Sequence, residues 1–383
     1  MKVKIYDKSN IDQMEWQNNK DGLFSRAYLT PLIKNDAIKY IDNTDTQMQL
    51  LSFEDNFFPI TVSNLKPIIK NSYVCSPTSH YVDYGIEEIK IELKDKKLLM
   101  NSSLKAVDLL GKFFKKRDFE KVVYVNNWLL STNLYTEFDL KLLKDIKQFL
   151  IERFPDKAIV FRSINQNHNT EIYNSLSLLD FKHVFSRQVY ILDPKKEIYK
   201  KKESYQKDLK VKRKSKYYWE NADKINPEDY SRIRYLYDDL YIKKYSELNP
   251  TFNENFIRET IKPECFTYKI LKKDEQIYAV FGYFERSGFI TAPLFGYDTS
   301  VDLKDGLYRL TALKILEDAI ENNYIVHQSS GVSKFKMYRG AEPSMEYNMV
   351  YYKHLPKKQQ QPWQIMNKLT DYAINPIMKK YSL

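Results

Sequence analysis

The sequence predicts an α/β (α+β) protein made of two similar units, each with a sheet flanked by helices. Three observations support this prediction. The 383 residues exceed what one hydrophobic core ordinarily organises, and 43% of them are apolar. The order of expected strands and helices in the first half recurs in the second. Six of the nine glycines lie between Gly282 and Gly340, so unusual backbone torsions concentrate in one region.

The first unit is expected to span residues 1–195. Its opening 70 residues are weakly patterned, and we interpret them as short helices and a first strand. Pro77 interrupts the polar stretch 71–88, which forms either a pocket wall or a simple turn. Apolar runs and helical stripes then predict, in order, a strand at Val122–Val125, a helix with its apolar stripe between Phe138 and Leu150, a strand at Ala158–Phe161, a helix at Thr170–Phe181 and a strand at Val184–Leu192.

A basic segment, residues 196–218, is expected to link the two units. Eleven Lys and Arg residues stand against three acids from Lys195 to Lys216, a net charge of +8 within the +11 of the whole chain. This run is either a solvated linker or helix face, or a patch for an anionic partner. CoA phosphates, an acidic acyl carrier protein, a membrane surface and RNA are the candidate partners.

The second unit is expected to cover residues 219–360, followed by a C-terminal helix in 361–383. Its predicted opening is a helix over Pro227–Asn249, a short helix over Asn253–Ile261, and a hairpin of Phe266–Leu271 with Ile277–Phe284. The tail helix, Trp363–Lys380, is amphipathic; packing on the protein body is the first interpretation and a membrane contact the second.

The glycine-rich region of the second unit begins with a predicted strand at Phe289–Tyr297. Pro293 lacks the N–H that a sheet needs, so we expect this strand to be bulged or splayed there. Asp305 and Gly306 precede a helical apolar stripe from Leu307 to Ile320. The free N–H groups at such a helix start suit an anion.

Several short motifs resemble the GNAT acyltransferase superfamily, in its divergent tandem branch that includes Fem-type transferases. They are Gly296-Tyr297-Asp298, Gly306-Leu307-Tyr308-Arg309 and Phe335-Lys336-Met337-Tyr338-Arg339-Gly340. In the first copy, Leu178-Leu179-Asp180-Phe181 resembles the leucine-x-glycine-phenylalanine signature of GNAT domains, with Asp180 in place of glycine. The resemblance covers about 150 residues well. It implies two tandem GNAT-like domains, each with a mixed, mostly antiparallel sheet. The usual pyrophosphate loop, Arg/Gln-x-x-Gly-x-Gly/Ala, is missing, because Thr299–Tyr308 contains one glycine.

The resemblance also assigns acyl-CoA, or an acyl carrier protein, as co-substrate between splayed strands of the second copy, with no permanently bound cofactor. The expected co-substrate contacts are Phe295, Gly296, Tyr297, Gly306, Tyr308, Arg309, Ser330, Lys336 and Arg339. Arg309 can pair with a phosphate through two hydrogen bonds. The first copy has no glycine between Asn126 and Glu137, so the co-substrate is assigned to the second copy.

Acyl transfer to an amine needs a base, an oxyanion donor and orientation of the reactants. Asp298, His327, Glu346 and Tyr338 are the catalytic candidates, with His327 chosen for its near-neutral ordinary pKa. Three of them have structural alternatives: Asp298 as a loop cap, His327 as a satisfied histidine and Glu346 as an edge charge. Tyr81, Asn126, Asn127 and Ser131 are candidates for the acceptor side. We expect no metal site, because Cys75 and Cys265 lie far apart and no zinc motif occurs.

The predicted function is an N-acyltransferase that moves an acyl group to a small amine by direct attack within a ternary complex. A Fem-type transferase using aminoacyl-tRNA on a cell-wall peptide is one alternative, and a non-enzymatic acyl-CoA sensor or scaffold is another. Nucleic acid is otherwise not expected as a partner. A cytoplasmic location is expected, since the N-terminus lacks an apolar signal core.

Overall fold

The computed structural model describes residues 3–92 and 94–380. Strands and helices alternate through the first half of the chain. In order they are β1 (Val3–Tyr6), α1 (Lys20–Lys34), β2 (Thr46–Phe53), β3 (Asn56–Ser63), α2 (Tyr84–Glu92), α3 (Lys97–Lys115), β4 (Val122–Val125), α4 (Leu143–Arg153), β5 (Ala158–Asn165), α5 (Thr170–Leu178) and β6 (Lys182–Leu192).

The second half repeats much of this order. Its elements are α6 (Glu203–Lys214), β7 (Tyr218–Asn221), α7 (Tyr230–Tyr237), α8 (Glu254–Thr260), β8 (Thr267–Lys273), β9 (Gln276–Arg286), β10 (Phe289–Tyr297), α9 (Leu307–Asn322), β11 (Ile325–His327), α10 (Ser333–Met337), β12 (Glu342–Tyr351), α11 (Lys357–Leu369) and α12 (Asn375–Lys380). Short π-helical turns adjoin α2, α7 and α11.

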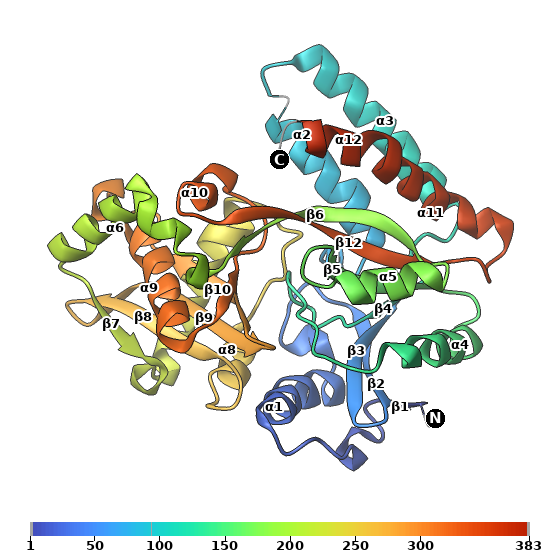
Figure 1. The fold of residues 1–383 in the computed structure, drawn as a ribbon, viewed down its shortest axis with the longest axis horizontal. Helices are drawn as coiled ribbons and strands as arrows, with labels where there is room; N and C mark the ends of the chain where they lie inside the picture. Colours follow the sequence, from blue (N-terminus) through green and yellow to red (C-terminus); the bar gives the residue numbers. More distant parts are fainter. Residues whose placement is uncertain (1–2, 93, 381–383) are drawn as a thin grey trace.

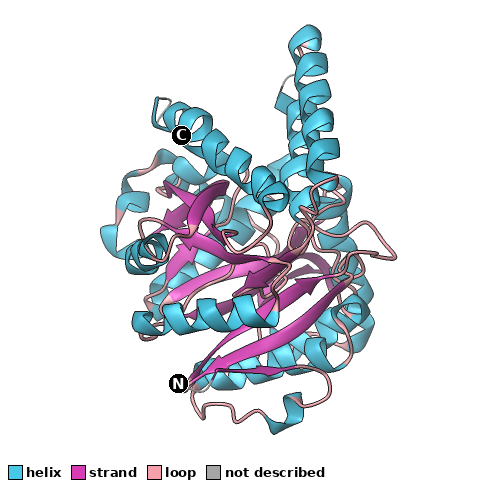
Figure 2. Ribbon diagram, turned by 90° about the vertical axis from the view of Figure 1, so that its right-hand side faces the viewer, coloured by secondary structure: helices cyan, strands magenta, loops and turns pink. Residues whose placement is uncertain are grey.

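All twelve strands belong to one sheet, with helices on both of its faces (Figure 1 and Figure 2). The strand order is β1-β2-β3-β4-β5-β12-β6-β11-β10-β9-β8-β7. Only β4–β5 and β10–β11 are parallel pairs, so the sheet is mixed and mostly antiparallel, as predicted. If the strands are counted inward from the two ends of the sheet, β1 occupies the position that corresponds to β7, β2 that of β8, and so on to β6 and β12. The two-copy prediction is therefore confirmed in the topology.

The two copies exchange their last strands. β12, from the end of the chain, lies between β5 and β6, and β6 from the first copy lies beside β11. The predicted boundary near residue 195 thus falls between β6 and α6 in the chain, while the sheet continues across both copies. Met349 of β12 is fully buried in the core of the first copy, among residues such as Phe161 and Phe181.

The glycine-rich region forms as its residues predict. β10 has the predicted bounds, and its pairing with β9 shifts register between Thr291 and Leu294, around Pro293. Gly306 has φ +68° and directly precedes α9. A left-handed torsion of this kind is accessible to glycine at little cost, which explains its position.

One expectation needs correction. The first 70 residues contain the 15-residue helix α1 and the long hairpin β2–β3, because buried residues of both join cores that are only visible in three dimensions. Residues 196–218, expected to form a linker or a helix face, contain the helix α6, which packs on α9. Aromatic rings meet between the copies: Phe24 of the first copy stacks on Phe284 of the second, with 5.0 Å between ring centroids.

Strand exchange predicts that a mutation near the C-terminus destabilises the first copy. Met349→Ala should lower the free energy of unfolding by about 2–5 kcal/mol, since it leaves a cavity in a closed core. Urea denaturation measures this. Leu178→Ala, at a residue 87% exposed on α5, is the control and should change stability by less than about 0.5 kcal/mol. Equal effects of the two substitutions would contradict this packing.

Candidate functional site

A seam opens between β10 and β11. The two strands pair only at Phe289 with Ile325 and Ile290 with Val326. Beyond this point β11 ends at His327, whereas β10 continues to Tyr297. On the side facing away from β9, β10 from Thr291 onward therefore has no neighbouring strand within the described parts of the chain. A cavity of about 740 Å³ occupies this place and is lined by both copies. The predicted splaying at Pro293 is thus confirmed.

The cavity walls are unusually rich in tyrosine. Tyr73 and Tyr84 come from the first copy, and Tyr237, Tyr241 and Tyr308 come from the second. Burial raises the pKa of each of these phenols, so all five remain neutral at physiological pH. The walls consequently offer flat apolar rings together with phenolic hydroxyl groups, which suit a partly polar ligand.

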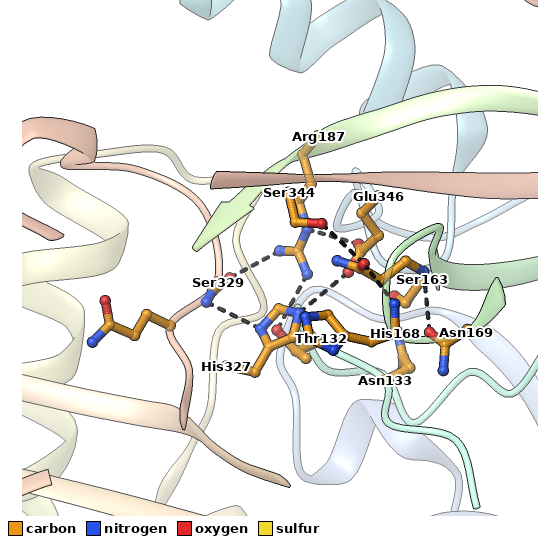
Figure 3. A network of polar contacts seen from close by, with 12 residues as sticks. Thr132, Asn133, Ser163, His168, Asn169, Arg187, His327, Ser329, Ser344 and Glu346 are labelled. Atoms are coloured by element: carbon orange, nitrogen blue, oxygen red, sulfur yellow. Dashed lines mark hydrogen bonds and ion pairs between the residues drawn. The ribbon is translucent and has the colours of Figure 1, made fainter. Parts of the chain in front are cut away.

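A buried polar network lies where the two copies meet (Figure 3). The Nε of Arg187 on β6 donates to Oε1 of Glu346 on β12 at 2.9 Å, and Arg187 also donates to the hydroxyls of Ser329 and Thr132. His327 Nε2 lies 3.6 Å from the other carboxylate oxygen of Glu346, Oε2. This arrangement ties β6, β11 and β12 together.

The network determines the charges of its members. Burial alone would raise the pKa of Glu346, but Arg187 and His327 outweigh it and lower this pKa to about 2. Burial lowers the pKa of His327 despite its bond with Glu346. His327 Nδ1 accepts the N–H of Ser329 at 3.2 Å, so both ring nitrogens are engaged. His327 is thus held at both ring nitrogens, and each carboxylate oxygen of Glu346 faces a basic side chain of the network.

Lys336 shapes the loop that follows β11. Its Nζ donates to the carbonyl oxygens of Gln328, Ser329 and Ser330 at 2.5, 3.3 and 2.7 Å. Burial, aided by the charge of Arg187, lowers its pKa to about 7. In the same loop Val332 has φ +43°, an uncommon torsion for a β-branched residue. Lys336 thus holds the loop beside the seam through three carbonyl groups.

Asp208 anchors α6 over the start of α9. This carboxylate is 2% exposed and accepts from Nε of Arg309 and Nε of Arg339, both at 2.6 Å. Gly306 lies under Val211 of α6, whose side chain would be 2.9 Å from an added Cβ. The helix start predicted to hold a pyrophosphate is therefore covered by α6, and Arg309 already has an anionic partner.

The structure brings part of the predicted site together. The predicted residues that line the cavity are Tyr81, Ser131, Phe295, Tyr308, His327, Ser330, Lys336 and Arg339. The others lie elsewhere. Asp298 pairs with Arg232 at 2.6 Å, and hydrogen bonds from Ser300 and Arg232 lower its pKa despite burial. Tyr338 is 60% exposed.

The remaining predicted residues have structural contacts. Gly296 lies against the backbone of Leu236, 2.6 Å from an added Cβ, and the ring of Tyr297 lies 5.6 Å from that of Tyr308. Asn126 accepts from the Trp128 indole at 2.8 Å. Asn127 donates to Thr61 and accepts from Arg162, so both asparagines are bound within the first copy.

Sequence reasoning did not single out Arg187, Asp208 or a second cavity. One feature of the sequence could have indicated Asp208, because it is an acidic residue within a run of basic residues. The second cavity, of about 570 Å³, adjoins the first at His327 and is lined by His168 and Asn165. Residues 3–92 and 94–380 contain no cluster of three or more His, Cys, Asp or Glu side chains arranged for a metal. None of the helices in those ranges combines the length and apolar character needed to cross a bilayer.

Comparison with known proteins finds similar solved structures but no similar curated sequence. No protein-family model and no curated sequence matches the chain. Among solved structures, L-PGS from Bacillus licheniformis is 12% identical, with a TM-score of 0.44 over 59% of this chain and 77% of that one. FemX is 10% identical, with a TM-score of 0.47 over 60% and 79%. A tandem GNAT protein from the clavulanic acid biosynthesis pathway is 7% identical, with a TM-score of 0.38 over 91% and 98%.

The buried carboxylate predicts a specific dependence of stability on pH. The pKa of Glu346 is about 2 when folded and about 4.5 as an ordinary glutamate, so its ion pair stabilises the fold above pH 4.5 and is lost as the pH falls toward 2. Glu346→Gln should reduce the free energy of unfolding by the order of 3 kcal/mol at pH 7, and this deficit should shrink below pH 4.5.

Urea titrations across this pH range measure the deficit. Glu342→Gln removes an exposed pair with Lys196 and is the control, with an expected effect below about 1 kcal/mol throughout. A deficit for Glu346→Gln that stays constant down to pH 3 would show that the Arg187 pair does not control the charge of Glu346.

Proposed function

We propose that the protein transfers an acyl group from a pantetheine thioester to a primary amine, in the seam between β10 and β11. The observation that carries this proposal is the unpaired edge of β10 facing a large cavity. A pantetheine arm is an extended chain with two amide groups, so it can pair with such an edge as an added strand. That pairing would orient the thioester, which is the main contribution that direct acyl transfer requires.

The reaction is a direct displacement. The amine nitrogen attacks the thioester carbonyl carbon, the C–N bond forms, and the C–S bond breaks. The thiolate leaves and takes up the proton that the amine loses, so the products are an amide and a free thiol. Backbone N–H groups on the open edge of β10 can stabilise the oxyanion as it develops.

The surroundings of α9 favour a carrier protein as the donor over CoA. A CoA diphosphate at the start of α9 would meet α6 and the acidic side chains of Asp302 and Asp305. Two lysines of α6 have acidic partners: Lys207 pairs with Glu203, and Lys212 pairs with Glu317. The other basic residues exposed on α6 form no ion pair within the described residues; they are Lys210, Arg213 and Lys214. A basic helix beside the seam suits an acidic acyl carrier protein, whose arm carries one phosphate.

Filling the seam should abolish transfer. Ala312 of α9 lines the cavity, so Ala312→Phe should reduce the turnover of an acyl donor and amine mixture by at least ~100-fold without unfolding the protein. Mass spectrometry of the amide product measures turnover, and circular dichroism checks folding. Ile320→Phe, on an exposed position of the same helix, should keep normal turnover. Unchanged turnover for Ala312→Phe would remove the seam from the reaction.

Charge reversal on α6 should weaken a carrier-protein donor specifically. Lys210→Glu with Lys214→Glu should raise the KM for an acyl carrier protein by about tenfold at low salt, less at high salt, and leave the KM for free acyl-pantetheine unchanged. Lys141→Glu, in the 3₁₀ turn Leu140–Leu142 before α4, with Lys144→Glu on α4 is the matched control, at the opposite end of the molecule (Figure 1). Efficient use of acyl-CoA, equal in the wild type and the α6 variant, would argue for CoA as the donor.

A further inference from the structure

The helices α2 and α3 form a hairpin that projects from the body of the protein (Figure 2). α3 buries only Phe114, near its C-terminal end, where its ring contacts Phe119, which in turn contacts Trp363. The opposite end of α3 therefore has few contacts with the protein. The N-terminal part of α3 costs conformational freedom without burying a residue in a core, so its exposed surface needs an explanation.

The exposed end of the hairpin carries large apolar side chains. Leu98 is 88% exposed, Leu99 is 51% exposed, and Leu109, farther along α3, is 66% exposed. Single exposed leucines are common, but adjacent ones in the first turn of a projecting helix form an apolar end that water solvates poorly. The second arm, formed by α11 and α12, rises from the same side of the molecule (Figure 1 and Figure 2) and exposes Tyr372 at 80% and Leu369 at 39%.

Basic residues surround the apolar end. From residue 94 to residue 105 there are four lysines, Lys94, Lys96, Lys97 and Lys105, and one acid, Asp95, so the local charge is +3. All four lysines are exposed. Leucine side chains can insert into a bilayer surface, and lysines beside them can contact anionic lipid headgroups. This combination of residues binds membrane surfaces that contain anionic lipids.

We propose that the α2–α3 hairpin docks the protein on an anionic membrane surface, with Leu98 and Leu99 inserted among the headgroups. Exposed leucines flanked by exposed lysines favour an anionic bilayer as the partner of this end. The cavity is lined by Tyr84 and Glu88 of α2 and by Met366 of α11, so it reaches the base of both arms. Docking through the arms would turn this end of the cavity toward the membrane.

Vesicle flotation tests the proposal with the full chain and no substrate. The protein should bind vesicles of equal parts phosphatidylglycerol and phosphatidylcholine, and bind phosphatidylcholine vesicles at least ~tenfold less. Leu98→Asp with Leu99→Asp should reduce binding to the anionic vesicles by at least ~tenfold. Lys96→Glu with Lys97→Glu should do so at low salt. Leu178→Asp, an equally exposed leucine on α5, should leave binding unchanged.

Three outcomes would overturn the proposal. They are no binding to the anionic vesicles, binding that the Leu98 and Leu99 double variant retains, and a change from dimer to monomer in that variant without lipid. The last result would make the hairpin an interface between copies of this chain. None of these measurements involves the transfer reaction, so they decide membrane docking independently of the proposed function.

Discussion

The contact on which the rest of the structure depends is the buried pair of Arg187 and Glu346. These residues face each other on β6 and β12, the two strands that the copies exchange. Removing either partner would leave a charge inside the protein with no counter-charge, which is costlier than the pair is stabilising. The pair also reaches His327 at the end of β11 and Ser329 in the loop beyond it. One ion pair thus connects the exchanged strands with the end of the seam.

The seam follows from this arrangement. Since β11 is short and β6 lies on its other side, β11 cannot follow β10 past Val326. Pro293 and the register shift in β10 keep that strand from closing the gap by itself. Two independent features therefore keep the seam open. One is the irregular backbone of β10, and the other is the strand exchange that places β6 beside β11. A preformed opening lets a ligand bind without first separating a closed sheet.

The second organising contact is Asp208, which forms ion pairs with both Arg309 and Arg339. It places a basic helix over the point where a GNAT-type domain is expected to hold a diphosphate. The resemblance in short motifs and the chemistry of the position therefore diverge here: Gly306 and Arg309 are present, but Gly306 lies under Val211 of α6 and Arg309 pairs with Asp208 of α6. This divergence is the reason for preferring a carrier-borne thioester to CoA in the proposed function.

Much of the fold could be predicted from the sequence, because the relevant signals are local. β10 has the predicted bounds, the irregularity at Pro293 is present, α9 starts after Gly306, and the two copies have the same order of elements. The candidate site was predicted in part. His327, Lys336 and Tyr308 line the cavity, whereas Asp298 and Tyr338 lie away from it. A motif places a residue on an element, but it does not say which way the side chain points once neighbouring elements pack.

The sequence by itself determined the periodicities, the glycine torsions and the proline irregularity, since each depends on residues a few positions apart. Only the tertiary structure decided which acid neutralises Arg309, 101 positions away, and which carboxylate meets Arg187, 159 positions away. It also decided that the last strand of the chain completes the first copy. These outcomes depend on the burial of charge and apolar surface between distant segments, and such energies exist only when the segments are brought together.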